Sequence, residues 1–249
     1  MAEKRTRTTI NEGAERQLDV RRSADRFHTA AGWLQSHHSF SFSHHYDPNN
    51  LHHGLLLVNN DDIIEPGTGF STHPHQDMEI VTWVLSGELE HKDTLHNADV
   101  IYPGLAQRMS AGTGIWHSEM NPRSETPVHL VQMWVLPDTS RVAPGYQQLD
   151  VNQQLQKGGL VAVASGRSEH SAISIRQKNA TLWAARLRPN EAISVPDARF
   201  AHLFVALGKV NLEGAGALEA GDAVRLTEAG SPALTAGPTG AEILIWEMN

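Results

Sequence analysis

The chain has 249 residues, of which 40% are hydrophobic and 19% charged, a balance typical of a globular protein with one large or two modest domains. Its formal net charge is −8, and its lysine and arginine residues are scattered without a basic stripe, which argues against direct nucleic-acid binding. The absence of cysteine excludes disulfides, zinc–thiolate sites, iron–sulfur clusters and thiol nucleophiles.

The first segment, residues 1–20, is polar and charged, and we expect it to form a poorly ordered tail or an arm laid on the body. It lacks the apolar core of a signal peptide. No apolar run approaches the roughly 18 residues that a membrane-spanning helix needs. We therefore expect a cytoplasmic protein without membrane contacts.

From Phe40 onward, short apolar stretches recur between turn residues. Each has the length of a strand and is rich in β-branched or aromatic residues, and most end at Asn, Asp, Gly or Pro. These expected strands cover residues 54–60, 79–87, 98–104, 129–137, 159–165, 172–177, 181–187, 201–208 and 223–228. Few segments keep an apolar period of 3.6 residues, so the pattern predicts an all-β sandwich or barrel protein.

The segment 136–148 concentrates proline, glycine and polar residues, which is typical of a linker. The halves on either side share an outline, because each passes through Gly-rich turns and closes on a Trp-containing strand, QMWVLP or ILIWEM. This weak internal repeat indicates duplication of one β-barrel unit. We therefore divide the chain into an N-terminal metal-binding barrel, residues 1–137, and a C-terminal barrel without metal, residues 138–249.

Two pairs of metal-ligating residue types occur at a spacing of two. Side chains two apart on a strand point to the same face, so His73 and His75 project side by side while Pro74 points away. Proline cannot donate to a ladder, which places this segment at the start of a strand or at a sheet edge. His117 and Glu119 repeat the spacing, and if the two segments meet, four side chains form one site with three nitrogens and one carboxylate. Such a site suits Fe(II), Mn, Co, Ni, Cu(II) or Zn.

Glu79 complicates this ligand set, because the spacing HxHxxxE puts it on the same strand face as His75. It could be a ligand, an acceptor that orients an imidazole N–H, or an ion-pair partner of Arg108. The histidine doublets of residues 37–38, 44–45 and 52–53 are expected in loops and at the surface, although one of His37, His38 and His44 could lie beside the ligands.

Three stretches resemble the pirin family of the cupin superfamily, namely HSFSFSHHYDP (38–48), EPGTGFSTHPHQDMEIVTWVLSGELEHKD (65–93) and QRMSAGTGIWHSEMNP (107–122). The resemblance covers residues 26–136 nearly throughout, whereas the second half is similar in layout only. It implies a bicupin, in which two jelly-roll-like cupin barrels lie face to face. It also implies a metal in the N-terminal barrel, with the ligands His73, His75, His117 and Glu119.

The sequence departs from the usual pirin pattern at two points. Pirins usually read PGD at the second turn and GIRHSE at the ligand strand, where this chain has Leu105 and Trp116 at the changed positions. Trp116 alternates with the ligands and should face away from the metal. The C-terminal half has no H-x-H, and its only histidines are His170 and His202, so we expect no second metal site.

Pirins are linked to quercetin 2,3-dioxygenase activity, so the resemblance implies that O2 opens the ring of a flavonol such as quercetin. The implied cofactor is one divalent transition metal, most simply Fe(II), with Zn, Ni, Mn, Co or Cu compatible. Glu119 would serve both as a ligand and as the catalytic base that takes the 3-hydroxyl proton.

Two alternatives stay open. The chain could be a non-catalytic, metal-bearing pirin that regulates a protein partner in a redox-sensitive way. It could also be a cupin for an unrelated small molecule, with a pocket lined by Phe42, Phe70, Met78 and Met109, each of which is also a candidate core residue.

Overall fold

Nearly all regular structure in the computed structural model, which describes residues 17–167 and 171–249, is β-strand. Each expected strand segment contains a strand, and the all-β prediction is confirmed. The helical elements described are one turn of 3-10 helix, Ser23–Asp25, and the short helix α1, Asn152–Leu155. Within the described residues, no helix is long and apolar enough to cross a membrane.

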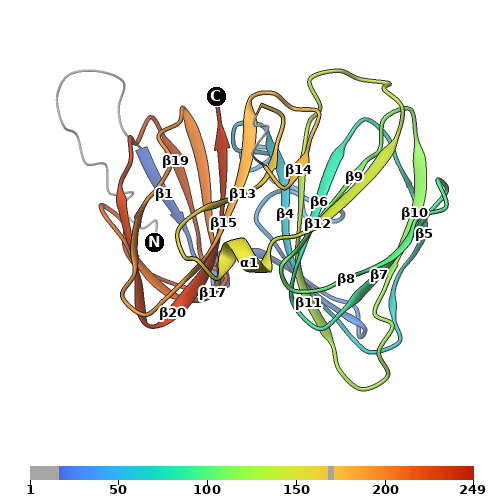
Figure 1. Cartoon of the computed structure of the whole chain (residues 1–249), viewed down its shortest axis with the longest axis horizontal. Coiled ribbons are helices and arrows are strands. Elements are labelled where there is room, and N and C mark those ends of the chain that lie inside the picture. The colour runs from blue at the N-terminus through green and yellow to red at the C-terminus, as the bar shows by residue number, and fades with distance from the viewer. Residues whose placement is uncertain (1–16, 168–170) are drawn as a thin grey trace.

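The strands form three sheets, and Figure 1 shows them as two β lobes side by side, with α1 between them. The seven-stranded sheet has the order β12 (Gly145–Asp150), β9 (Leu105–Ser110), β6 (Glu79–Ser86), β11 (Val128–Val135), β4 (Leu56–Ile64), β3 (Leu34–His38) and β2 (Phe27–Ala30). The four-stranded sheet has the order β5 (Gly69–His75), β10 (Ile115–Met120), β7 (Leu89–Asp93) and β8 (Ala98–Ile101).

The second lobe is one sheet with the order β1 (Gln17–Arg21), β19 (Ala223–Thr227), β17 (Phe200–Leu212), β20 (Ala233–Met248), β15 (Ala180–Leu187), β13 (Val161–Ser165) and β14 (Ile173–Ser174). Two further strands extend it, β16 (Ala192–Ser194) on β20 and β18 (Gly216–Glu219) on β17.

Two strands cross the expected division between the halves. β1 belongs to the first half of the sequence but pairs with β19, so residues 17–20 form part of an arm laid on the second lobe. The remainder of the expected tail, residues 1–16, lies outside the described residues. β12 pairs with β9 of the first lobe, so only residues 136–144 of the expected linker lie outside a strand.

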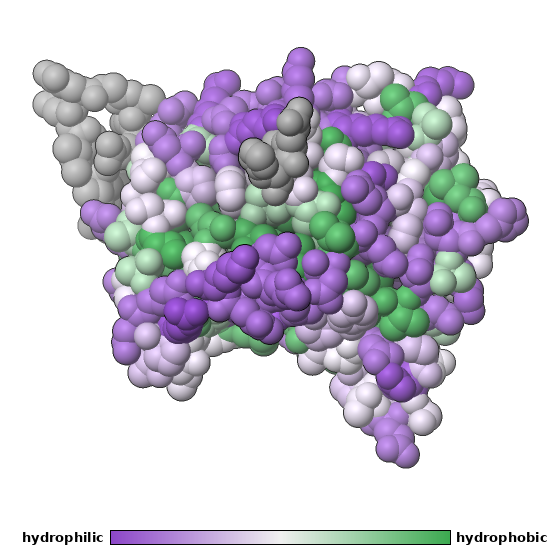
Figure 2. All heavy atoms as spheres, viewed as in Figure 1, coloured by the Kyte–Doolittle hydropathy of each residue, from purple (hydrophilic) through white to green (hydrophobic). Residues whose placement is uncertain are grey.

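A shared apolar core joins the two lobes. β6 is buried along seven of its eight residues, because one face lines the first barrel while the other packs against the second lobe. Val81 and Trp83 of β6 belong to the same buried cluster as Leu182 and Trp246 of the second lobe. The indole N–H of Trp83 also donates to Glu242 Oε1 across this interface at 2.7 Å. Figure 2 shows hydrophobic side chains gathered in a band across the middle of the molecule.

The inner face of the seven-stranded sheet carries one polar row with a further row on each side. Gln107, Thr82, Gln132, Asn60 and His38 lie opposite one another on five successive strands. One flanking row contains the apolar partners Met109, Ile80 and Trp134. The other begins with Val84 and Leu130 and continues into the buried polar residues Asp62 and Ser36. The second lobe has an apolar cluster of aliphatic side chains such as Leu203, Val224 and Ile245.

Replacing His202 by leucine should make the free energy of unfolding depend less on acid pH. His202 is 1% exposed at the lobe interface, and burial lowers its pKa well below 6.5, with Arg225, His53 and Arg26 lowering it further. The folded protein thus favours neutral His202, whereas the unfolded chain protonates this residue below about pH 6.5. The stabilisation is present above that pH and is lost as the pH falls towards the lowered folded-state pKa.

Urea unfolding of wild type and His202→Leu at pH 7.5 and 5.5 measures this effect. Unfolding of the wild type at acid pH takes up a proton at His202, and the variant lacks this uptake. We therefore expect the slope of unfolding free energy against pH to be smaller in His202→Leu by up to about 1.4 kcal/mol per pH unit, the value for one proton. The matched control is His44→Gln, which changes an exposed histidine and should keep the wild-type slope. An unchanged slope in His202→Leu contradicts the prediction.

Candidate metal centre

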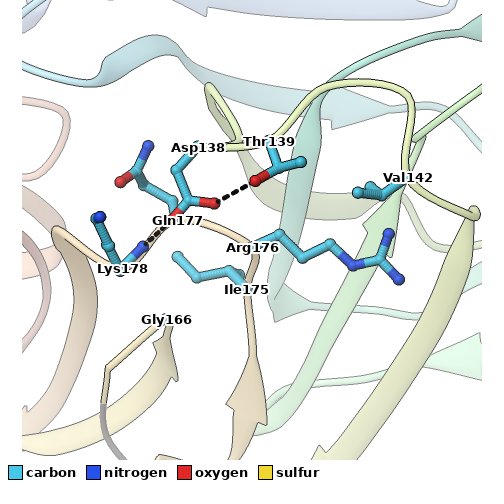
Figure 3. A pocket seen from close by; sticks show the side chains of 8 residues that line it. All are labelled: Asp138, Thr139, Val142, Gly166, Ile175, Arg176, Gln177 and Lys178. Carbon is cyan, nitrogen blue, oxygen red and sulfur yellow. Dashed lines mark hydrogen bonds between the residues drawn. The ribbon is translucent and has the colours of Figure 1, made fainter.

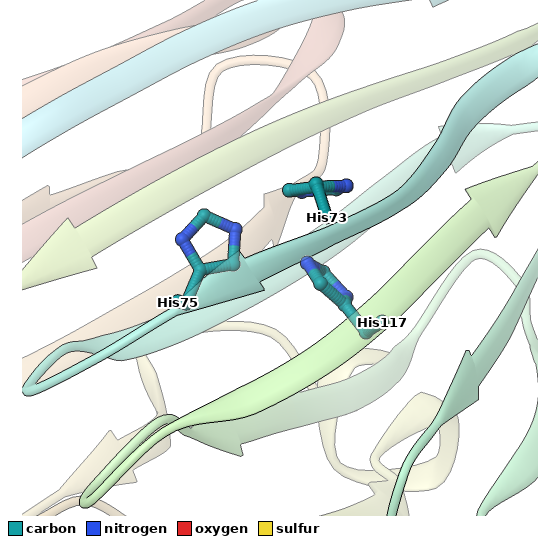
Figure 4. Close-up of side chains that lie close together, drawn as sticks. All are labelled: His73, His75 and His117. Carbon is teal, nitrogen blue, oxygen red and sulfur yellow. The ribbon is translucent and has the colours of Figure 1, made fainter.

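His73, His75 and His117 converge from two neighbouring strands. β10 runs antiparallel to β5, which places His117 opposite His73 and Ile115 opposite His75. The ring centroids lie 4.5 Å apart for His73 and His117, 4.8 Å for His73 and His75, and 5.0 Å for His75 and His117. Figure 4 shows the three imidazoles gathered over the two strands. One ligand atom from each ring lies within 4.8 Å of the others, which is a spacing that a single ion can bridge.

The strand that carries His73 and His75 is the edge of its sheet, as the proline between them predicts. Pro74 lies opposite Trp116, which is 51% exposed and faces solvent, in agreement with the predicted alternation. β5 ends at His75, because Asp77 adopts a positive φ of 47° in the turn that follows.

The prediction that Glu79 shares a strand face with His75 is wrong. The turn at Asp77 separates them, and Glu79 begins β6 in the seven-stranded sheet. Glu79 Oε2 accepts hydrogen bonds from Ser110 Oγ at 2.8 Å and from the Arg176 backbone N–H at 3.1 Å, while burial raises the pKa of its carboxyl. The ion pairs described include none between Glu79 and Arg108, whose Nε donates to the Ser174 carbonyl instead.

The hydrogen bonds and burial of the three histidines suit metal binding. Nε2 of His75 and Nε2 of His117 are buried and have no hydrogen-bond partner among the described residues. His73 donates its Nδ1 proton to the Ser71 carbonyl at 2.8 Å, which leaves a lone pair on Nε2. Burial and the neighbouring imidazoles lower the pKa of His75 to about 4 and that of His117 to about 3, so both rings are neutral at pH 7. The residues present therefore fit a borderline divalent ion.

Glu119 falls into a second group that shares His117. Its carboxylate, the His91 imidazole and His117 offer ligand atoms within 4.8 Å of one another, and Glu119 lies opposite His91 in the pairing of β10 with β7. The register of β10 against β5 shifts between His117 and Glu119. The described residues contain no single group that includes all four expected ligands. The structure instead brings them into two overlapping groups.

A hydrogen-bonded chain holds the Glu119 carboxylate, which is 2% exposed. Trp134 Nε1 donates to Gln132 Oε1 at 3.1 Å, and Gln132 Nε2 donates to Glu119 Oε2 at 2.7 Å. Thr82 Oγ1 makes a longer contact of 3.5 Å with Oε1. Both Thr82 and Gln132 belong to the polar row, so the sheet itself fixes the orientation of the carboxylate.

His91 and Gln132 were not identified from the sequence as residues of this centre, although the sequence contains a feature that points to each. His91 stands two residues before Asp93, which is the same-face spacing of the other candidate pairs. Gln132 is a polar residue inside the apolar stretch HLVQMWV. A polar side chain at the buried face of a strand needs partners, and here the partners are Glu119 and Trp134.

Aromatic rings link the centre to one of the early histidines. Trp134 packs edge-on against His75 with centroids 4.8 Å apart, Phe42 packs against Trp134 at 5.6 Å, and His38 stacks on Phe42 at 5.1 Å. His38 is 3% exposed on β3 and its Nδ1 lies 2.9 Å from Asn60 Oδ1, so the surface prediction is wrong for this residue. The exposed His44 follows that prediction.

The other candidate pocket residues are mostly core. Met109 is 1% exposed within a cluster that includes Ile80 and Ile115, and Met78 packs against this cluster. Phe70 packs against a second apolar cluster, with its ring centroid 6.3 Å from that of His73.

A separate hollow lies at the junction of the lobes (Figure 3), and its lining residues are Asp138, Thr139, Val142, Gly166, Ile175, Arg176, Gln177 and Lys178. None of them belongs to either ligand group. The described residues of the second half contain no metal-ligand group, and His170 lies outside them. The histidine centre in the first lobe is therefore the candidate functional site.

Comparison with known proteins gives matches along most of the chain. The Pirin family matches residues 18–135, and the Quercetinase C-terminal cupin domain matches residues 162–248. A Mycobacterium tuberculosis protein, named as a provisional quercetin 2,3-dioxygenase, is 56% identical over 93% of this chain and 95% of its own length. The Quercetin 2,3-dioxygenase of Escherichia coli K12 is 50% identical over 52% of this chain and 56% of its own length.

Solved structures show the same architecture. The bacterial pirin YhhW from Escherichia coli, in complex with nickel(II), superposes with a TM-score of 0.85 and 34% identity, covering 93% of this chain and 99% of that chain. A quercetin 2,3-dioxygenase from Acinetobacter baumannii superposes with a TM-score of 0.70 over 94% of this chain and 79% of that chain; at 18% identity, this likeness shows the fold alone. The prediction of two cupin domains face to face is confirmed.

Proposed function

This chain belongs to the pirin family, and on that premise we propose that it is a metal-dependent dioxygenase that opens a flavonol such as quercetin with O2. The observation that carries the proposal is the convergence of His73, His75 and His117, in which the buried Nε2 atoms of His75 and His117 lack hydrogen-bond partners among the described residues. The dioxygenase names of the relatives support the reaction class.

The proposed ligands of one divalent metal are His73, His75, His117 and Glu119. Nickel(II) in the Escherichia coli pirin supports a divalent transition metal, and Fe(II) is the ion we propose here. Such an ion would lower the pKa of the flavonol 3-hydroxyl and provide the redox or Lewis-acid chemistry that a reaction with O2 requires.

Glu119 is the proposed catalytic base for the 3-hydroxyl proton. Gln132 donates to Oε2, whereas Oε1 receives only the 3.5 Å contact from Thr82, so Oε1 has the weaker protein contact and would take the proton when Glu119 swings off the metal. The apolar clusters around Leu130 and Ile80 flank the polar row and help to keep water from the buried carboxylate. Trp134 and Phe42 supply flat apolar surfaces that suit the rings of a flavonol.

Aerobic turnover of quercetin by metal-replete protein, purified without a histidine tag, tests the function. We expect loss of the flavonol with release of carbon monoxide. Glu119→Gln should lower kcat by about 10²- to 10⁴-fold, which is the usual contribution of a general base. Glu125→Gln is the matched control, because it makes the same change at an exposed carboxylate. If metal-replete protein leaves flavonols unchanged while a known quercetinase consumes them, the dioxygenase proposal is overturned.

A further inference from the structure

His91 and Asp93 of β7 lie behind His117, and the proposed reaction uses neither of them. Both side chains are 0% exposed, and Asp93 lies opposite His117 in the strand pairing. The two residues are joined by a contact of 3.1 Å between His91 Nε2 and Asp93 Oδ2. Metal-binding imidazoles are usually oriented by an acceptor for their second ring nitrogen, and here the group that faces His117 Nδ1 is His91.

The surroundings of Asp93 make it an acceptor on both oxygens. Oδ1 accepts the backbone N–H groups of Leu95 at 2.8 Å and Asn97 at 3.1 Å, while Oδ2 accepts Asn97 Nδ2 at 2.8 Å. An ionised carboxylate cannot donate, so the fourth contact requires His91 to donate from Nε2. A neutral His91 then carries its lone pair on Nδ1.

His91 Nδ1 lies 3.5 Å from His117 Nδ1, in a long contact between two ring nitrogens. Only one of these nitrogens can hold a proton between them, and the lone pair on His91 makes His117 the donor. His117 then keeps its lone pair on Nε2, the buried atom without a partner. Tyr146 of β12 stacks on the His91 ring with centroids 4.9 Å apart and an interplanar angle of 29°, which fixes the direction of the contact.

We infer that Asp93 and His91 form a hydrogen-bond relay that sets the tautomer of His117 and presents its Nε2 lone pair to the metal. This inference rests on the proposed ligand role of His117. It makes His91 a positioning residue that acts through His117 and not a ligand, although His91 belongs to the second ligand group.

Asp93→Asn should invert the relay. The backbone N–H groups of Leu95 and Asn97 need the amide oxygen, so the amide nitrogen faces His91 Nε2 as a donor. His91 then carries its proton on Nδ1, and His117 carries its own on Nε2, where it blocks the metal. We expect the Kd for Ni(II), measured by calorimetry, to rise about 10- to 100-fold. Asn97→Ala is the matched control, because it removes a donor from the same oxygen without reversing the contact, and its Kd should stay near the wild-type value.

The tautomer can be read directly in metal-free protein labelled with ¹⁵N-histidine, by NMR at pH 8, where imidazoles are neutral. Loss of one signal set in His117→Gln assigns the His117 resonances. We expect an Nδ1–H tautomer in wild type and Asn97→Ala, and an Nε2–H tautomer in Asp93→Asn. An Nε2–H tautomer of His117 in wild type overturns the relay, whether or not Asp93→Asn folds. A folded Asp93→Asn with wild-type tautomer and Kd also overturns it. Failure of the proposed metal site would look different. Wild type would then bind no Ni(II), while NMR would still show the Nδ1–H tautomer of His117.

Discussion

His117→Ala should leave the purified protein without stoichiometric metal. His117 is the one residue that belongs to both ligand groups, so its removal leaves two ligands in either group. Structural metal sites with four ligands bind with about 10–16 kcal/mol, which is about 3 kcal/mol per ligand. The loss of one ligand therefore weakens binding by about 100-fold or more. Elemental mass spectrometry of protein purified without a histidine tag measures the metal content.

His73→Ala and His91→Ala distinguish the two groups. If His73, His75 and His117 hold the metal, together with Glu119, His73→Ala loses it as completely as His117→Ala does. His91→Ala should then retain more metal than His73→Ala, because only the orientation of His117 is affected. Metal that survives in His73→Ala and disappears in His91→Ala would assign the ion to the group of His91, His117 and Glu119. Metal retained in His117→Ala would contradict both assignments.

The parts of the site that were predictable from the sequence are the local ones. The spacing of two between His73 and His75 and the proline between them determine which way the side chains point and which strand is an edge, and the structure agrees. The same spacing rule gave a wrong prediction for Glu79. The rule requires an unbroken strand, and the turn at Asp77 ends the strand before Glu79. Periodicity carries information along a strand only while the backbone stays extended.

Contacts between residues on neighbouring strands could not be predicted from the spacing of residues in the sequence. His38 appears in the sequence as one of several doublets, yet it completes a polar row with Asn60 and Gln132 that only the pairing of β3, β4 and β11 creates. His91 touches His117 because β7 pairs with β10, a neighbour about 26 residues away in sequence. Strand order depends on tertiary packing, which cannot be read from the residue pattern of a single sequence.

The two lobes differ in what their interiors hold, although both have the same fold. The first lobe carries a row of polar side chains across its sheet, and two of them, Gln132 and Thr82, orient the carboxylate of Glu119. The second lobe has an apolar cluster of aliphatic side chains, and its described residues contain no metal-ligand group. The second lobe instead contributes to the interface, where it closes the outer face of β6. We therefore expect the second lobe to act mechanically, by holding the sheet on which the polar row stands.

This mechanical role predicts that Trp83→Ala will destabilise the whole protein. Trp83 is fully buried in the shared core and donates to Glu242 across the interface. Truncation of a buried tryptophan costs about 3–5 kcal/mol because it removes apolar contacts and leaves a cavity. Loss of the indole N–H deprives buried Glu242 of one donor, although Arg186 Nε still donates to its other oxygen at 2.8 Å.

Trp83→Phe is the matched control, since it keeps an aromatic ring in the core and removes mainly the hydrogen bond to Glu242. It should cost about 1.5–3 kcal/mol, the usual contribution of a hydrogen bond to a charged group. Urea unfolding followed by circular dichroism gives both values, and metal content measured on the same samples reports on the site. Because β6 carries Trp83 on its outer face and Thr82 on its inner face, a shifted strand should also weaken metal retention. A cost below about 1 kcal/mol for Trp83→Ala, in the range of ordinary surface substitutions, would mean that the lobes do not depend on this contact.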